Sequence, residues 1–324
     1  MSESVNRGWI VDLVQRLPAG ALSRAWGFLV RRRHPRVAVG VAKRLFVRAA
    51  GVDLSEAAAP ITTFDSLEDL FIRRLRPGVR RVDPSPVAVV SPVDAVVGAC
   101  GTVNDGTLLQ VKGRSYSLGR LLDDEDEATR YEGGPYATFY LSPKDYHRIH
   151  APVSGEVREA RIVPGRLLPV FQESVDRIDE LFAKNERLIT YLDTTEAGRV
   201  AVVKVGATMV GRIGVTYDLT ARTNVAGGRT RHLRYDPGHA IKKGEEVGVF
   251  ELGSTVVLVG ERGLVAFDSL VPGETVRVGS RIGTLLARVP EARGRATKVT
   301  APAAPDPAPR PKGGGKKRSR KARA

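Results

Sequence analysis

Apolar and polar positions along the chain change their periodicity near residue 87. Before that point, apolar residues recur every three or four positions, which is the spacing of one side of a helix. Three such stripes are Ile10, Leu13, Val14 and Leu17; Leu22, Trp26, Leu29 and Val30; and Val37, Val41 and Leu45. The pattern predicts two or three short helices within residues 5–50. It also predicts a helix over residues 62–76, for which Thr63 or Asp65 would be the cap.

From residue 87 onward, short runs rich in Val, Ile, Thr and Tyr alternate with turns that contain Gly or Pro. The runs cover residues 87–103, 136–142, 155–163, 188–193, 199–214 and 247–259. Strands at this spacing predict an antiparallel β-sandwich or barrel-like core. Residues 118–131 and 175–184 interrupt the pattern and predict helical insertions. The predicted fold class is therefore α+β, mainly antiparallel.

Charge divides the chain differently from hydropathy. Of the total net charge of +15, residues 1–50 carry +8 and residues 290–324 carry +9, so that residues 51–289 carry −2. Basic ends suit an anionic surface, either phospholipid or nucleic acid. Residues 290–324 have almost no apolar bulk and are predicted to be disordered. The expected domains are a helical region at 1–60, a core at 61–289 and a basic tail at 290–324.

The first region has two interpretations. Apolar stripes with Trp and a basic face are typical of an amphipathic segment that lies in a membrane interface. The alternative is a helical cap that packs on the protein's own core. No stretch reaches the roughly 18 apolar residues of a spanning helix, and the start lacks a secretory signal pattern. A single cysteine, Cys100, excludes an intrachain disulfide.

Three short segments carry candidate chemistry. Gly253 and Ser254 stand between two β-like runs, where a serine is well placed to attack the backbone carbonyl before it. Glycine tolerates the strained dihedrals that such an attack needs. The serine hydroxyl also needs a base and an acid that orients the base. His150 and Asp94 lie in segments that offer both.

Six segments in the same order resemble one family, the pyruvoyl-dependent, self-cleaving phosphatidylserine decarboxylases. The segments are residues 71–80, 111–118, 140–150, 181–187, 205–211 and 252–255, the last reading Leu-Gly-Ser-Thr. The resemblance covers roughly residues 61–287. One departure is Ala95, where the family usually has a glycine after the aspartate, so the turn after Asp94 is expected to differ slightly.

The resemblance implies self-cleavage between Gly253 and Ser254 into chains 1–253 and 254–324. Ser254 is the implied nucleophile, His150 the base that takes its proton, and Asp94 the residue that orients His150. Ester formation and β-elimination would leave dehydroalanine at position 254. Its hydrolysis, with release of ammonia, would give a covalent pyruvoyl group, which replaces pyridoxal phosphate as cofactor.

The implied enzyme is a carboxy-lyase of phospholipid biosynthesis. Its pyruvoyl group would form a Schiff base with phosphatidylserine and release CO2 to leave phosphatidylethanolamine, with His147 as the acid that returns a proton. The implied partners are phosphatidylserine, an anionic membrane surface and the second cleaved chain, with a higher homo-oligomer left open. The implied location is peripheral, on the cytoplasmic face of the cell membrane.

Four other interpretations remain at this stage. His147 and His150 could form a metal site, but no Cys cluster or third spaced ligand is near, so no metal is expected. A carrier domain of the biotinyl or lipoyl type would need a lysine at a hairpin tip, which is missing. A nucleic-acid-binding protein is not favoured, because the core is not basic and aromatic residues are only 6%. A self-processing relative without decarboxylase activity stays open because of Ala95.

Overall fold

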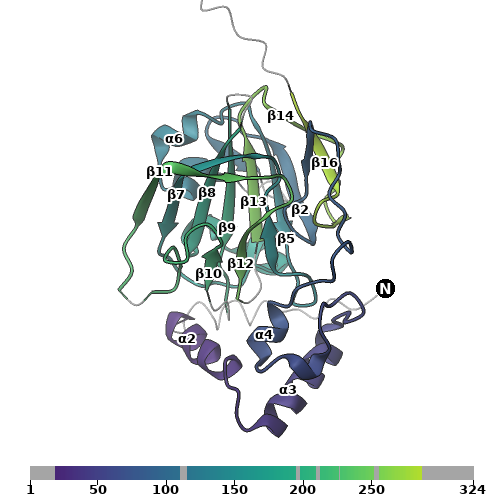
Figure 1. Ribbon diagram of the computed structural model, residues 1–324. Helices are drawn as coiled ribbons and strands as arrows, with labels where there is room; N and C mark the ends of the chain where they lie inside the picture. Colours follow the sequence, from purple (N-terminus) through teal and green to yellow (C-terminus); the bar gives the residue numbers. More distant parts are fainter. Residues whose placement is uncertain are drawn as a thin grey trace, which may run out of the picture. The chain divides into compact units, whose positions relative to one another are not determined.

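An antiparallel sheet of eight strands is the largest element of the fold (Figure 1). The computed structural model describes residues 19–109, 115–194, 198–208, 212–225, 227–251 and 255–286. In spatial order the strands are β11 (Arg231–Ile241), β7 (Gly155–Val163), β8 (Arg187–Asp193), β9 (Arg199–Val205), β13 (Thr255–Gly260), β5 (Pro135–Tyr140), β2 (Ala95–Thr102) and β15 (Thr275–Val276). Strand β13 is buried along its whole length. Such a strand needs cover on both faces of the sheet.

A small sheet covers one face. It contains β10 (Ile213–Val215), β12 (Glu246–Phe250) and β6 (Arg148–His150). Ile149, Val247 and Phe250 from this sheet share one apolar core with Phe139 and Val256 of the large sheet. A third sheet, β1 (Ala88–Val90), β16 (Arg281–Leu285) and β14 (Val265–Phe267), adds Val89, Val265 and Ile282 to the same core. The arrangement is therefore sandwich-like.

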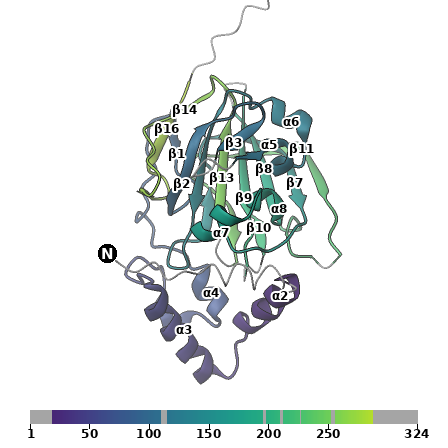
Figure 2. The ribbon, with the colours of Figure 1, turned by 180° about the vertical axis from the view of Figure 1, so that it is seen from behind.

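Short helices cover the other face, as the reverse view shows (Figure 2). They are α5 (Leu118–Leu122), α6 (Glu125–Thr129), α7 (Gln172–Arg177) and α8 (Leu181–Lys184), together with the hairpin of β3 (Thr107–Leu109) and β4 (Ser115–Ser117). Leu121, Phe182 and Tyr131 from this layer form a second core with Val203 and Val257 of the large sheet. The helical insertions expected at 118–131 and 175–184 are thus present.

The N-terminal part contains α2 (Ala19–Val30), α3 (Arg36–Ala50), a 3-10 turn η1 (Ile61–Thr63) and α4 (Leu67–Phe71). Helix α4 is shorter than the helix predicted over 62–76, and its cap is Ser66, so the prediction of Thr63 or Asp65 is wrong. The Ser66 side chain accepts from the Asp69 backbone NH while Asp69 accepts from the Ser66 NH. This reciprocal capping box fixes the first turn at residue 67.

The predicted α+β, mainly antiparallel class is confirmed, and each predicted β run contains at least one observed strand. The stripe at residues 10–17 and the tail at 290–324 lie outside the described residues. Within the described part of the chain, no helix is both long and apolar enough to cross a membrane.

Candidate active site

One edge of the large sheet gathers the segments that the sequence singled out. Val96, Tyr140, Thr255 and Val205 lie side by side on the neighbouring strands β2, β5, β13 and β9. Asp94 directly precedes β2, and Thr255 is the first residue of β13. Because neighbouring strands are about 4.8 Å apart, the starts of β2 and β13 are separated by about 10 Å, with β5 between them.

The histidine segment is tied to this edge by two backbone hydrogen bonds. The His150 amide donates to the Pro92 carbonyl at 2.8 Å, two residues before Asp94. The Phe250 amide donates to the His147 carbonyl at 2.9 Å, at the end of β12. The two histidines are thereby held between the segment of Asp94 and the segment that leads to β13.

Gly253 and Ser254, the expected cleavage pair, lie outside the described residues. Their surroundings along the chain are described on both sides. The chain leaves the small sheet at Phe250 and enters the large sheet at Thr255. The expected cleavage bond therefore belongs to the short connection between the two packed sheets.

Backbone contacts fix the tautomer of His150. Its Nδ1 lies 2.8 Å from the Gly244 carbonyl oxygen, which only accepts, so Nδ1 carries the proton. Nε2 is buried and has no hydrogen-bond partner within the described residues. Burial lowers the pKa of His150, which favours the neutral ring. The imidazole thus presents a buried, unprotonated Nε2, which is the state of a general base.

The His147 ring is also oriented by a backbone carbonyl, and it is fully buried. Its Nδ1 donates to the Asp145 carbonyl at 2.9 Å, and its ring lies 3.9 Å, centroid to centroid, from the ring of Phe71. Nε2 is buried without a partner in the described chain. Burial lowers the pKa of His147 to about 3, and the charge of Arg73 acts in the same direction. In the uncleaved chain, the acid role expected for His147 requires that Nε2 first accept a proton.

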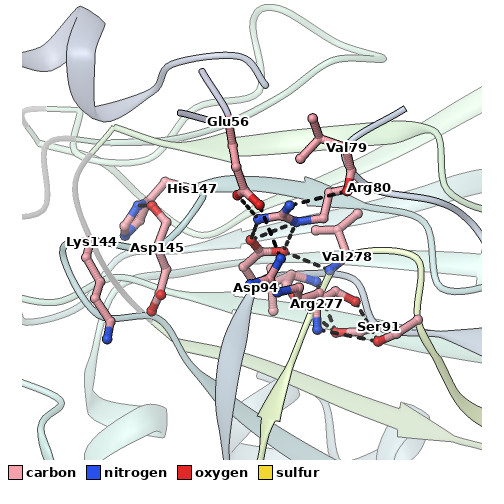
Figure 3. A network of polar contacts seen from close by, with 12 residues as sticks. Glu56, Val79, Arg80, Ser91, Asp94, Lys144, Asp145, His147, Arg277 and Val278 are labelled. Atoms are coloured by element: carbon pink, nitrogen blue, oxygen red, sulfur yellow. Dashed lines mark hydrogen bonds and ion pairs between the residues drawn. The ribbon is translucent and has the colours of Figure 1, made fainter. Parts of the chain in front are cut away.

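Asp94 is buried and bound to Arg80 (Figure 3). Arg80 Nε lies 2.9 Å from both carboxylate oxygens of Asp94. Arg80 Nη2 also contacts Asp94, and it donates to Glu56 at 2.7 Å. The Val278 amide donates to Asp94 Oδ1 at 2.8 Å. Asp94 and His150 have no direct hydrogen bond here. Burial lowers the pKa of His150, and the hydrogen bond to Gly244, then the charge of Glu246 and then the charge of Asp94 partly offset this effect.

Two cavities adjoin this edge of the sheet. The first, of about 270 Å³, is lined by charged residues: Asp94, Glu56, Arg73, Arg80, Lys144 and Arg277. The second, of about 440 Å³, has mostly apolar walls that include Val97, Val170 and Phe182, and it reaches Tyr140 and Thr255. The Thr255 hydroxyl is buried without a hydrogen-bond partner in the described chain. A polar and an apolar cavity thus meet the strand ends that carry the candidate residues.

Comparison with known proteins identifies the family. The phosphatidylserine decarboxylase family model matches residues 67–284. A phosphatidylserine decarboxylase proenzyme from Anaeromyxobacter sp. (strain K) is 45% identical over 281 residues, which is 86% of this chain and 99% of that protein. Proenzymes from Brevibacillus brevis (40% identical, 84% of this chain and 96% of theirs) and Myxococcus xanthus (42%, 87% and 100%) are also similar. The chain belongs to the phosphatidylserine decarboxylase family. It is therefore a decarboxylase, as the resemblance of its motifs implied.

Two residues of this site were not predicted from the sequence. Arg80 is the last residue of the basic motif at 71–80, but nothing in the sequence indicates that its side chain binds Asp94. Gly244 supplies the carbonyl that orients His150. The φ of Gly244 is +79°, in the left-handed region, and a Cβ there would lie 2.4 Å from a Val82 methyl. The sequence signal for Gly244 was the turn Lys-Lys-Gly-Glu at 242–245.

Within the described part of the chain, no group of three or more His, Cys, Asp or Glu residues could hold a metal ion. The Nδ1 atoms of both histidines are occupied by backbone carbonyls.

Replacement of Arg80 tests the buried ion pair. In Arg80→Met, Asp94 keeps one backbone hydrogen bond but loses its cation, and we expect a loss of about 3 kcal/mol in the free energy of unfolding. The added substitution Asp94→Asn should recover part of this loss. Urea denaturation measures both, and the control is Arg277→Met, at an exposed arginine that pairs with Glu56. Equal losses of unfolding free energy in the Arg80 and Arg277 variants would contradict the assignment of Arg80 as the buried partner of Asp94.

Burial of His147 predicts a pH dependence of stability. The folded pKa of about 3 lies below the ordinary value of 6.5, so the unfolded chain binds more protons between these values and stability falls on acidification. Between pH 6.5 and pH 5 the contribution is about 2 kcal/mol. Unfolding free energies at several pH values should show a steeper fall for the native chain than for His147→Phe. The same slope in both proteins would show that His147 is not buried neutral.

Proposed function

We propose that the chain cleaves itself between Gly253 and Ser254, and that the resulting pyruvoyl enzyme converts phosphatidylserine into phosphatidylethanolamine and CO2. The observation that carries this proposal is the buried, unprotonated Nε2 of His150, whose backbone is hydrogen-bonded to Pro92 in the segment of Asp94. The family supports phosphatidylserine as the substrate. The self-cleavage, the residue roles and the place in phospholipid biosynthesis are parts of the proposal.

In the proposed cleavage, Ser254 Oγ attacks the carbonyl carbon of Gly253 while His150 Nε2 accepts the hydroxyl proton. The peptide bond is exchanged for an ester, and the amino group of Ser254 takes up a proton. Loss of the Cα proton of residue 254 then eliminates the Gly253 carboxylate and leaves dehydroalanine at the start of chain 254–324. Addition of water and release of ammonia convert this residue into the pyruvoyl group. Asp94 stabilises the imidazolium that forms at His150, through its charge and without a direct hydrogen bond.

The residues of this edge suit a pyruvoyl group at position 254. Consecutive Cα atoms are 3.8 Å apart, so position 254 directly adjoins Thr255, whose hydroxyl is buried and unpartnered. His147 and His150 each offer a buried, unpartnered Nε2 on the histidine segment. The pyruvoyl group supplies a ketone that withdraws electrons from the bond broken when CO2 leaves. His147 would move the proton that the remaining carbon needs.

The two cavities fit the two parts of the substrate. The charged cavity contains both cations and carboxylates, as suits a headgroup that has a phosphodiester, a carboxylate and an ammonium group. The neighbouring cavity has mostly apolar walls and suits an acyl chain. Substrate and nucleophile would then meet at the strand ends near Asp94 and Thr255.

Membrane attachment through α3 is the second part of the proposal. Val37, Val41 and Leu45 form one stripe on this helix and are 81%, 46% and 62% exposed. Three apolar side chains in one exposed stripe are unusual for a helix of a soluble domain. Arg44 and Arg48 add positive charge to the same helix, which suits an anionic lipid surface. The opposite side of the helix packs through Phe46 onto Phe71.

The cleavage is tested by Ser254→Ala, with Ser280→Ala at an exposed serine as the control. The native chain and the control should separate under denaturing conditions into chains of 253 and 71 residues. The smaller chain should have a blocked N-terminus by mass spectrometry, and both proteins should form phosphatidylethanolamine from phosphatidylserine vesicles. Ser254→Ala should stay whole and inactive. Cleavage in that variant would rule out Ser254 as the nucleophile.

The membrane stripe is tested by a triple serine variant at Val37, Val41 and Leu45. Each buried aliphatic side chain contributes about 1.5 kcal/mol or more to burial in an apolar phase, so binding to anionic vesicles should weaken at least tenfold. The control replaces three exposed apolar residues elsewhere: Leu219, Val225 and Val271. Vesicle co-sedimentation measures both variants. Equal binding by the two would reject α3 as the attachment surface.

A further inference from the structure

Arg73 is a buried cation whose hydrogen bonds are incomplete. It follows α4 and is only 4% exposed. Its Nη2 donates to the Lys144 carbonyl at 2.8 Å. Its Nε and Nη1 are buried and have no hydrogen-bond partner within the described residues. Such donors are rare in folded proteins, because a buried donor without an acceptor loses its hydration and gains nothing in return.

The other arginines of the charged cavity differ from Arg73 in this respect. Arg80 is engaged by Asp94 and Glu56, and Arg277 pairs with Glu56. Arg73 lines the same cavity but forms no ion pair with a described carboxylate. The charges of Asp145, Asp94 and Glu56 reach it only from longer range. The cavity therefore contains a buried guanidinium for which the described part of the chain provides no ion-pair partner.

We propose that Arg73 binds the phosphodiester of the lipid headgroup in the cavity beside Asp94, an inference that rests on the proposed function. A guanidinium is suited to phosphate oxygens because it is always charged and its donors are rigidly placed. The Lys144 carbonyl holds Nη2 and so restricts how the guanidinium can turn. Lys144 itself lines the cavity and can add a second positive charge.

The headgroup has two oxyanions, and the chemistry favours the phosphodiester over the carboxylate. A cation paired with the carboxylate would stabilise the substrate more than the transition state, in which that negative charge moves away from the departing CO2. Binding energy on a group that does not react avoids this loss and positions the reacting carbon. Arg73 on the phosphodiester thus contributes to binding without opposing decarboxylation.

Two substitutions at Arg73 separate charge from structure. Arg73→Gln retains a donor for the Lys144 carbonyl but removes the charge, whereas Arg73→Lys retains the charge but loses the rigid fork. We expect both to self-cleave, with the KM for short-chain phosphatidylserine raised at least tenfold in Arg73→Gln and less in Arg73→Lys. The control is Arg74→Gln at the neighbouring, exposed arginine that pairs with Glu246. Its KM should stay within twofold of the native value.

A competitor identifies the anion that Arg73 binds. Glycerophosphoethanolamine has the phosphodiester but no carboxylate, so its inhibition of the native enzyme should weaken at least tenfold in Arg73→Gln. A raised KM with unchanged inhibition by glycerophosphoethanolamine would move Arg73 to the carboxylate and overturn the proposal. An unchanged KM in Arg73→Gln, in a native enzyme that produces phosphatidylethanolamine, would also overturn it and leave the proposed function intact.

Two further outcomes are separated in the same experiment. A native chain that neither cleaves nor decarboxylates would overturn the proposed function itself. If Arg73→Gln does not fold or cleave, Arg73→Lys decides. We expect a raised KM and weakened inhibition in that variant, because a lysine lacks the fixed donors of the guanidinium; native values of both would overturn the proposal.

Discussion

The pairing of β13 on both sides is the constraint on which the rest of the structure depends. Val256 lies opposite Phe139 of β5 and Lys204 of β9, and the pairing continues without a register shift from Thr255 to Val259 on both sides. A central strand with two ladders and two buried faces is difficult to displace. The start of β13 is thereby fixed relative to Asp94, which precedes the next strand but one.

The same pairing explains how the protein can tolerate a break before residue 254. The part after the proposed break contributes β13, β14, β15 and β16, and three of these pair with strands from the part before it: β13 with β5 and β9, β15 with β2, and β16 with β1. Its apolar residues belong to both cores, through Val256 in one and Val257 in the other. Cleavage would remove one covalent bond and leave these ladders and cores in place, so the two chains would remain one folding unit.

The fold was predictable from the sequence where pattern and burial agree. The runs at 155–163 and 188–193 became β7 and β8 because their flanking turns and β-branched residues leave few alternatives. The helix predicted over 62–76 is too long because Leu67, Leu70, Phe71 and Leu75 keep a helical spacing beyond the end of α4. After residue 71 the chain turns away, and Leu75 instead forms a β-bridge with Ala57. Apolar spacing alone does not show whether Leu75 continues the helix or pairs with Ala57.

The candidate site was predictable only in part, for a related reason. Asp94, His147 and His150 follow from motifs, because each motif is a local run of residues. The partners that set their state come from elsewhere in the chain: Arg80 for Asp94 and the Gly244 carbonyl for His150. The carbonyl is a backbone group, which leaves no mark in residue type. Contacts of this kind depend on how the sheets pack and not on the spacing within any one segment.

Electrostatics at the site follow one rule, which is that every buried charge or imidazole is held by a backbone group. Asp94 accepts from the Val278 amide, His147 and His150 donate to carbonyls, and Arg73 donates to the Lys144 carbonyl. Backbone partners are fixed by the fold and do not titrate, so they orient these side chains without changing the charge of the cavity. Several of the buried side-chain atoms that have no hydrogen-bond partner within the described residues lie here: the Nε2 atoms of the two imidazoles and two donors of Arg73. Others, such as the hydroxyls of Tyr116 and Tyr191, lie elsewhere in the fold. Unpaired polar atoms are costly in a protein interior, so the group of them near Asp94 and the histidine segment supports the site proposed there.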